Sequence, residues 1–124
     1  MTHDNVLTRR VIGCAIEVHR ILGPGLLESV YEDCLCDELT HSGIQHDRQV
    51  AMPIVYKGRR VGADLQVDIR VTDELIVEVK AVQQVLPVHE VQLLTYLRLS
   101  GVPLGLLIAF NEPTLKKGLR RRCL

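Results

Sequence analysis

The stretch from Leu104 to Phe110 is the feature that most constrains how this chain can fold. It is a continuous apolar run of strand length, Leu-Gly-Leu-Leu-Ile-Ala-Phe. A strand with no polar side chain on either face is typical of a position covered on both sides. We therefore expect a sheet with helices packed on both faces, which is an α/β layered architecture.

Two segments before this run alternate in the manner of strands. Val61–Val71 and Glu74–Val82 flank a turn at Thr72-Asp73. In the first segment one face carries Leu65, Val67, Ile69 and Val71, and the other carries Asp64, Gln66, Asp68 and Arg70. In the second segment one face carries Leu75, Val77 and Val79, and the other face carries Ile76, Glu78 and Lys80. An earlier β-rich segment, Val50–Tyr56, ends at a turn formed by Lys57-Gly58-Arg59.

Three segments have helical spacing. The first two are expected at residues 6–22 and 26–42, separated by Gly23-Pro24-Gly25, and the third runs from Pro87 to Ser100 before Gly101. Residues 115–124 are expected to form a last edge strand or a frayed tail. The order is helix, helix, three antiparallel strands, a crossover helix and a buried strand. It predicts a mixed sheet in a three-layer sandwich, with residues 1–124 forming one domain.

Composition narrows the function classes. Fifteen basic and fifteen acidic residues cancel, which argues against a strongly basic, sequence-independent nucleic-acid binder. No apolar run is long enough to span a membrane and no signal peptide is evident, so we expect a cytoplasmic protein.

Eleven of the fifteen cations are arginine, which suits bidentate phosphate contacts. They include Arg59 and Arg60, and the C-terminal basic residues are Lys116, Lys117, Arg120, Arg121 and Arg122. The simplest interpretation of this tail is a solvated end.

Asp64, Glu78 and Lys80 are the strongest candidates for chemistry. Glu78 and Lys80 lie two apart on one strand and therefore share a face. A hairpin centred near Thr72-Asp73 brings the partner of Asp64 within a residue or two of Lys80. Two carboxylates suit Mg²⁺, and a lysine can stabilise charge on a phosphate. The pattern alone is more typical of a solvated charged face with one cross-strand ion pair.

Two further features sit near these strands. Glu28 occupies the first turn of the second helix, where it either compensates the helix dipole or reaches over the sheet as a metal ligand. Gln92 and Tyr96 lie four apart on one face of the third helix, either as a boundary pair or as polar groups directed toward the strand ends.

Several separate motifs, in order, resemble the GxxExxY proteins, a branch of the PD-(D/E)XK nuclease superfamily. The resemblance runs from about residue 6 to residue 122. The motifs are Gly25-Leu26-Leu27-Glu28-Ser29-Val30-Tyr31, Ala63-Asp64-Leu65, Ile76-Val77-Glu78-Val79-Lys80-Ala81-Val82, Gln92-Leu93-Leu94-Thr95-Tyr96-Leu97 and Gly105-Leu106-Leu107-Ile108-Ala109-Phe110.

The resemblance implies a restriction-endonuclease-like fold and assigns roles. Asp64 and Glu78 match the acidic metal ligands and Lys80 matches the catalytic lysine. Glu28 matches a helix glutamate that completes the metal site, while Gln92, with Tyr96 one turn further, matches a glutamine of the following helix. Two positions depart from the family pattern. Ala63 replaces the proline of the motif, and Asp68 stands where a strand glutamate is usual and is interpreted as a solvated strand residue.

Three functions follow as hypotheses. The first is a nuclease that uses Mg²⁺ or Mn²⁺ and acts on nucleic acid, DNA ahead of RNA. The second is a nucleic-acid-binding accessory protein that kept the fold, with Arg59, Arg60, Lys116, Lys117, Arg120 and Arg121 contacting phosphates. The third is a protein-interaction domain, because small domains with apolar helical faces often form homodimers.

Overall fold

A computed structural model describes residues 6–124. Four helices and seven strands follow one another within these residues. In order they are α1 (Val6–Leu22), α2 (Glu28–His41), β1 (Asp47–Met52), β2 (Val55–Tyr56), β3 (Arg59–Arg60), β4 (Leu65–Val71), β5 (Leu75–Lys80), α3 (Pro87–Ser100), β6 (Leu104–Ala109), α4 (Leu115–Gly118) and β7 (Leu119–Cys123).

Five strands form one mixed sheet in the order β1-β4-β5-β6-β7. Strands β1, β4 and β5 pair antiparallel, β5 and β6 pair parallel, and β7 closes the far edge antiparallel to β6. Helix α3 is the crossover that makes the parallel pair possible, because two parallel neighbours cannot be joined by a tight turn. The expected sequence of elements is confirmed, including the edge strand at the C-terminal end.

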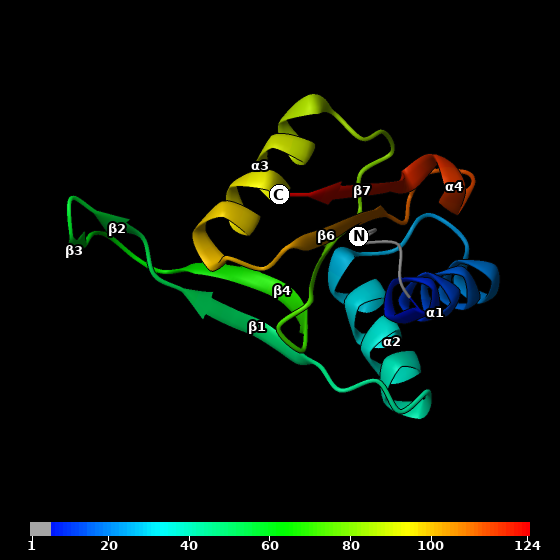
Figure 1. Ribbon diagram of the computed structural model, residues 1–124. Helices are drawn as coiled ribbons and strands as arrows, with labels where there is room; N and C mark the ends of the chain where they lie inside the picture. Colours follow the sequence, from blue (N-terminus) through cyan, green and yellow to red (C-terminus); the bar gives the residue numbers. More distant parts are fainter. Residues whose placement is uncertain (1–5) are drawn as a thin grey trace.

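Helices cover both faces of this sheet (Figure 1). On one face α1 and α2 pack over Ile69, Val71, Val77 and Val79. On the other face Leu93 and Leu97 of α3 pack over a second cluster of buried residues. Every residue of β6 is buried, as its uninterrupted apolar sequence predicts. The three-layer α/β sandwich is therefore confirmed.

Gly105 permits the close approach of α3 to β6. A Cβ at this position would lie 2.8 Å from Cδ1 of Leu93, which is too short for a real contact. The missing side chain is thus what allows the crossover helix to sit directly on the central strands.

Some strand boundaries differ from the sequence prediction. The segment expected as one strand, Val50–Tyr56, is divided at Pro53-Ile54, because the chain leaves the main sheet there and forms the small β2–β3 hairpin. Lys57 and Gly58 turn this hairpin with φ of 50° and 77°, as the turn pattern predicted. The hairpin projects from the body of the molecule (Figure 1). Residues 61–64, expected to be strand, precede β4.

The alternation expected along β4 also fails at its centre. Val67 packs in the cluster under α3, whereas Ile69 packs in the cluster under α1 and α2. The strand therefore changes face at Asp68. Gln49 lies opposite this point on β1, between the pairs Arg48–Ile69 and Val50–Val67, and has a φ of 49°. A left-handed residue of this kind interrupts the regular pleat, and the side-chain pattern of β4 is displaced with it.

Candidate active site at a fork between two strands

The backbone ladder between β4 and β5 stops after the pair Ile69–Val77. Beyond it, side chains replace backbone bonds: the backbone N–H of Asp68 donates to Oε1 of Glu78 at 3.1 Å, and the N–H of Val79 donates to Oδ2 of Asp68 at 2.9 Å. We call this place, defined by Asp68, Glu78 and Val79, the fork. Two carboxylates are thereby fixed between strands that would otherwise be joined by their main chains.

Glu78 is the most buried acid of the fork, at 3% exposure. Burial, and after it the negative charge of Asp68, raise the pKa of its carboxyl from 4.5 to about 8, although the N–H of Asp68 and the charge of Lys80 oppose the change. A carboxyl group with this pKa is largely protonated near neutral pH when no cation is present. Such a perturbed acid beside a second carboxylate is a common property of functional sites.

Glu28 approaches the fork from α2, at the first residue of that helix. It is solvent accessible, yet neighbouring protein atoms remove enough water from its carboxylate to raise the pKa. The charge of Lys80 and a hydrogen bond from the backbone of Ala81 lower it, and the charge of Asp68 raises it. The pKa of Glu28 is therefore influenced by the charges of both Lys80 and Asp68, and its role as a metal ligand stays a prediction.

The turn before Glu28 is anchored by two side chains from elsewhere in the fold. The hydroxyl of Tyr31 donates to the carbonyl of Gly23 at 2.6 Å and accepts the N–H of Leu26 at 3.1 Å. Asn111, just after β6, accepts the N–H of Gly25 at 2.6 Å and donates to the carbonyl of Ala81 at 2.7 Å. The start of α2 is therefore tied directly to the end of β5.

Tyr31 itself is held in the core. Its side chain is fully buried, and its ring stacks on Phe110 with centroids 4.7 Å apart and planes 6° apart. The spacing Gly25-x-x-Glu28-x-x-Tyr31 consequently has a structural reason. The tyrosine fixes the turn from within the first turn of α2, and Glu28 begins the helix directly after that turn.

Helix α3 supplies a phenol to the other side of the fork. Tyr96 is 8% exposed, and its pKa is raised by burial and then by the charges of Glu78 and Asp68. Gln92 donates from Nε2 to the Tyr96 hydroxyl at 3.1 Å. The two residues thus form a hydrogen-bonded pair on α3, and the charges of both carboxylates influence the tyrosine.

Asp64 is the predicted site residue that the structure does not bring to the fork. Both its oxygens accept hydrogen bonds from Nη2 of Arg60, at 2.9 and 3.0 Å, and this ion pair lies at the base of the β2–β3 hairpin. The position beside Glu78 is occupied by Asp68 instead. The interpretation of Asp68 as a solvated residue needs correction, because its two oxygens accept hydrogen bonds from Gln49 and Val79.

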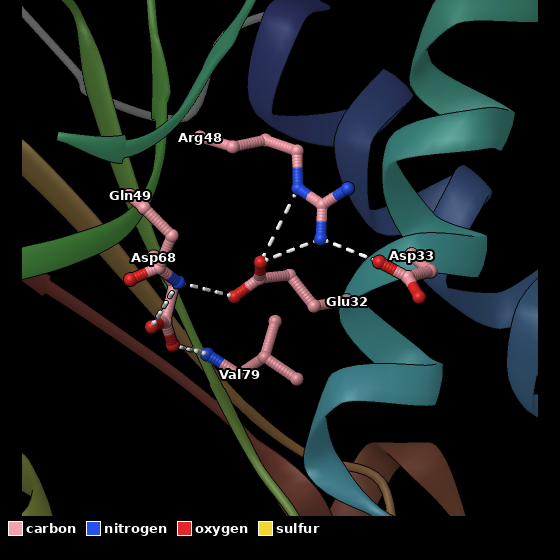
Figure 2. Close-up of polar contacts among 6 residues, drawn as sticks. All are labelled: Glu32, Asp33, Arg48, Gln49, Asp68 and Val79. Atoms are coloured by element: carbon pink, nitrogen blue, oxygen red, sulfur yellow. Dashed lines mark hydrogen bonds and ion pairs between the residues drawn. The ribbon is translucent and has the colours of Figure 1, made fainter.

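The sequence contained a signal for Asp68. A hairpin centred at Thr72-Asp73 places residue 68 opposite residue 78, as it pairs Ile69 with Val77. Two other residues beside the fork were not predicted from the sequence. They are Glu32 on α2 and Gln49 on β1. The Gln49 amide donates to both Glu32 and Asp68 and so connects the two acids (Figure 2).

The basic candidates for nucleic-acid contact fall into two regions. Arg59 and Arg60 are exposed on the projecting hairpin. Lys116 and Lys117 are exposed on α4, whereas Arg120 on β7 lies 4.0 Å from Glu90 of α3 in an ion pair. Arg121 is exposed on the same edge strand.

The residues of the fork suit a hard divalent cation. Among residues 6–124 no group of three or more His, Cys, Asp or Glu side chains is arranged to hold a metal ion. Mg²⁺, however, commonly takes one or two carboxylates and completes its shell with water. Asp68 and Glu78 provide such a pair of oxygen donors, and Glu28 stands close to it. Within the same residues no helix is long and apolar enough to cross a membrane.

Comparison with protein families identifies the class. A family model described as the PD-(D/E)XK nuclease superfamily matches residues 5–122, almost the whole chain. The chain therefore belongs to the PD-(D/E)XK nuclease superfamily, and its sandwich is the restriction-endonuclease-like fold of that group. No curated protein and no solved structure matches it significantly.

Proposed function

We propose that this domain is a Mg²⁺-dependent nuclease, of the GxxExxY branch, that hydrolyses phosphodiester bonds in nucleic acid, DNA ahead of RNA. The observation that carries the proposal is the fork, where Asp68 and Glu78 are fixed side by side next to Lys80. Placing two carboxylates together costs free energy unless a cation or a proton neutralises them. A divalent metal is the neutralising group that the family implies.

Each residue of the site has a distinct role in this proposal. Asp68 and Glu78 hold Mg²⁺ or Mn²⁺, and Glu28 completes the set at the rim. When bound, the metal would polarise the scissile phosphate and acidify the attacking water. Lys80 orients that water and stabilises the negative charge that develops on the phosphate. Tyr96, held by Gln92, contacts the substrate from the opposite side.

Asp68 is proposed as the aspartate ligand in preference to Asp64. The reason is that Asp68 contacts the backbone of β5 and shares its charge with Glu78, whereas Asp64 is engaged by Arg60. The two aspartates provide a matched pair of variants. Asp68→Asn and Asp64→Asn make the same chemical change four residues apart.

The first test is a calorimetric titration of Mg²⁺ and Mn²⁺ into the wild type and these two variants. We expect saturable binding that Asp68→Asn abolishes and Asp64→Asn retains. The opposite pattern would assign the ligand to Asp64. Absence of binding in the wild type, alone and with a short oligonucleotide, would contradict a metal-dependent mechanism.

The second test is cleavage of single- and double-stranded DNA and RNA. Lys80→Met keeps the apolar stem of the side chain and removes its charge, so we expect intact metal binding with a loss of cleavage of about 10²-fold or more. Binding of nucleic acid without any cleavage by the wild type would instead favour the accessory-protein hypothesis.

Substrate contacts are proposed for the two basic regions. The β2–β3 hairpin directly precedes β4, whose first residues lie at the same end of the sheet as Lys80. Arg59 and Arg60 can therefore contact phosphates near the site, and Lys116, Lys117, Arg120 and Arg121 can extend the contact along the other edge. Replacing Arg59 by alanine should weaken binding to all sequences alike and reduce the salt slope by about one.

A further inference from the structure

Glu32 is a buried carboxylate that the proposed reaction does not use. It lies on α2, one helical turn after Glu28, and is only 7% exposed. Both of its oxygens accept hydrogen bonds. Oε2 accepts two hydrogen bonds from Arg48, at 2.7 and 3.2 Å, and Oε1 accepts one from Nε2 of Gln49 at 2.9 Å. The Arg48 side chain is 40% exposed, so the ion pair is only partly buried and by itself contributes little to stability.

Gln49 links this buried acid to the fork (Figure 2). Its Nε2 group has two N–H bonds, and the one not given to Glu32 is directed at Oδ1 of Asp68, 3.3 Å away. Oδ2 of the same aspartate accepts the N–H of Val79. Gln49 and Val79 thus hold opposite oxygens of one carboxylate and fix its plane.

This arrangement leaves Asp68 able to bind a cation. Each carboxylate oxygen has two lone-pair directions, and one hydrogen bond uses only one of them. A cation can therefore bind Asp68 without displacing Gln49 or Val79. Outer groups that orient a metal ligand in this manner commonly contribute as much as 10- to 100-fold to metal affinity.

The backbone of Gln49 is unusual at the same place. Its φ of 49° lies in the left-handed region, which residues other than glycine rarely adopt within a strand. The regular register of β1 and β4 continues on both sides of it. Backbone strain at one residue persists where its surroundings enforce it, and such positions concentrate at functional sites. Here the unusual backbone turns the Gln49 amide toward both Glu32 and Asp68.

We propose that Gln49, aligned by the Glu32–Arg48 ion pair, is a positioning residue that fixes the Asp68 carboxylate for metal binding. The inference rests on the proposed function, since it presumes that Asp68 is a ligand. It adds to that site a chain of hydrogen bonds from Arg48 and Glu32 through Gln49 to Asp68, which connects α2 and β1 to the ligand. Helix α2 then contributes twice, through Glu28 directly and through Glu32 by way of Gln49.

The test uses two substitutions of Gln49 that differ in backbone freedom. Gln49→Ala removes the amide and keeps the strained backbone, whereas Gln49→Gly removes the amide and relieves the strain. We expect both to weaken Mn²⁺ binding about 10- to 100-fold in calorimetry. Gln49→Gly should nevertheless unfold at the same or higher denaturant concentration than Gln49→Ala. Gln45→Ala, at an exposed position just before β1, is the control and should bind Mn²⁺ as the wild type does.

A readout without metal separates positioning from a merely structural role. If Gln49 fixes Asp68, then Gln49→Gly should increase hydrogen exchange at the Val79 amide while amides of β6 keep their protection. In the Asp68→Asn background, Gln49→Gly should change neither Mn²⁺ binding nor exchange at Val79, because the residue acts through Asp68.

The outcomes distinguish the two proposals. Wild-type affinity and unchanged Val79 exchange in Gln49→Gly would overturn the positioning role and leave the metal site intact. If the wild type binds no Mn²⁺ with or without an oligonucleotide, the metal-dependent function and the positioning role both fall.

Discussion

Replacing Glu78 by glutamine should remove the pH dependence that this residue imposes on stability. Glutamine resembles the protonated acid in shape and keeps an oxygen that can accept the Asp68 N–H. It cannot ionise. The variant therefore reports what it costs the folded protein to carry a charge at this buried position.

The magnitude follows from the pKa of Glu78, which rises from 4.5 in the unfolded chain to about 8 in the folded protein. Between these two values the folded protein holds a proton that the unfolded chain has released, so stability falls as the pH rises. Each pH unit in this window costs about 1.4 kcal/mol, or about 5 kcal/mol across it. That is a large share of the stability of a small domain.

The assay is denaturant unfolding of wild type and Glu78→Gln from pH 4.5 to 8.5, with a chelator present to remove divalent metal. The two proteins should have similar unfolding free energies at pH 4.5. At pH 8.5 the variant should be more stable by several kcal/mol. All other titrating groups are shared, so the difference between the two curves isolates Glu78. Parallel curves over the whole range would refute the claim that this carboxyl is neutral in the metal-free protein.

Three other predictions concern the same region and its supports. Mn²⁺ binding at pH 7 should release about one proton, because Glu78 must ionise to act as a ligand. For the same reason the Mn²⁺ affinity should rise with pH up to about 8. Calorimetry in buffers of different ionisation enthalpy measures both effects. Tyr31→Phe should lower the unfolding free energy by about 1–3 kcal/mol, since two backbone groups of the turn lose their partner, and an unchanged denaturant midpoint would contradict the anchoring role. Gly118→Ala should lower the melting temperature more than Gly105→Ala does. A Cβ at Gly118 would lie 2.2 Å from the backbone oxygen of Ala109, whereas a Cβ at Gly105 would meet the side chain of Leu93, which can shift.

The fold was largely predictable because its elements carry strong local patterns. The third helix was predicted with the boundaries that it has, Pro87–Ser100, since a proline begins it and a left-handed glycine follows it. The buried strand Leu104–Ala109 was recognisable because nothing in it is polar. Patterns of this type depend on which faces are covered and not on the details of any contact.

The site was harder to predict because it depends on a break in the alternation of inward and outward side chains along β4. Strict alternation would carry Asp64 and Asp68 along one face of a long strand. In the structure the backbone of Gln49 breaks that alternation, β4 begins only at Leu65, and the aspartate beside Glu78 is Asp68. Neither the left-handed conformation of a glutamine nor the side-chain bonds that replace the ladder has a signature in a single sequence. The place of Glu28 at the start of the second helix was predictable, by contrast, because the Gly-Pro-Gly break before it is a local signal.

The anchoring of that turn has a consequence for how the protein is made. Glu28 is near the beginning of the chain, but the turn that directs it is bonded to Asn111, 86 residues beyond Gly25. A ribosome therefore synthesises the acids of the fork well before the residue that secures Glu28 beside them. A nascent chain or proteolytic fragment that stops short of Asn111 also lacks the attachment between α2 and the end of β5. The geometry of the candidate site is thus tied to completion of the sheet, because the residue that joins α2 to the end of β5 comes after β6.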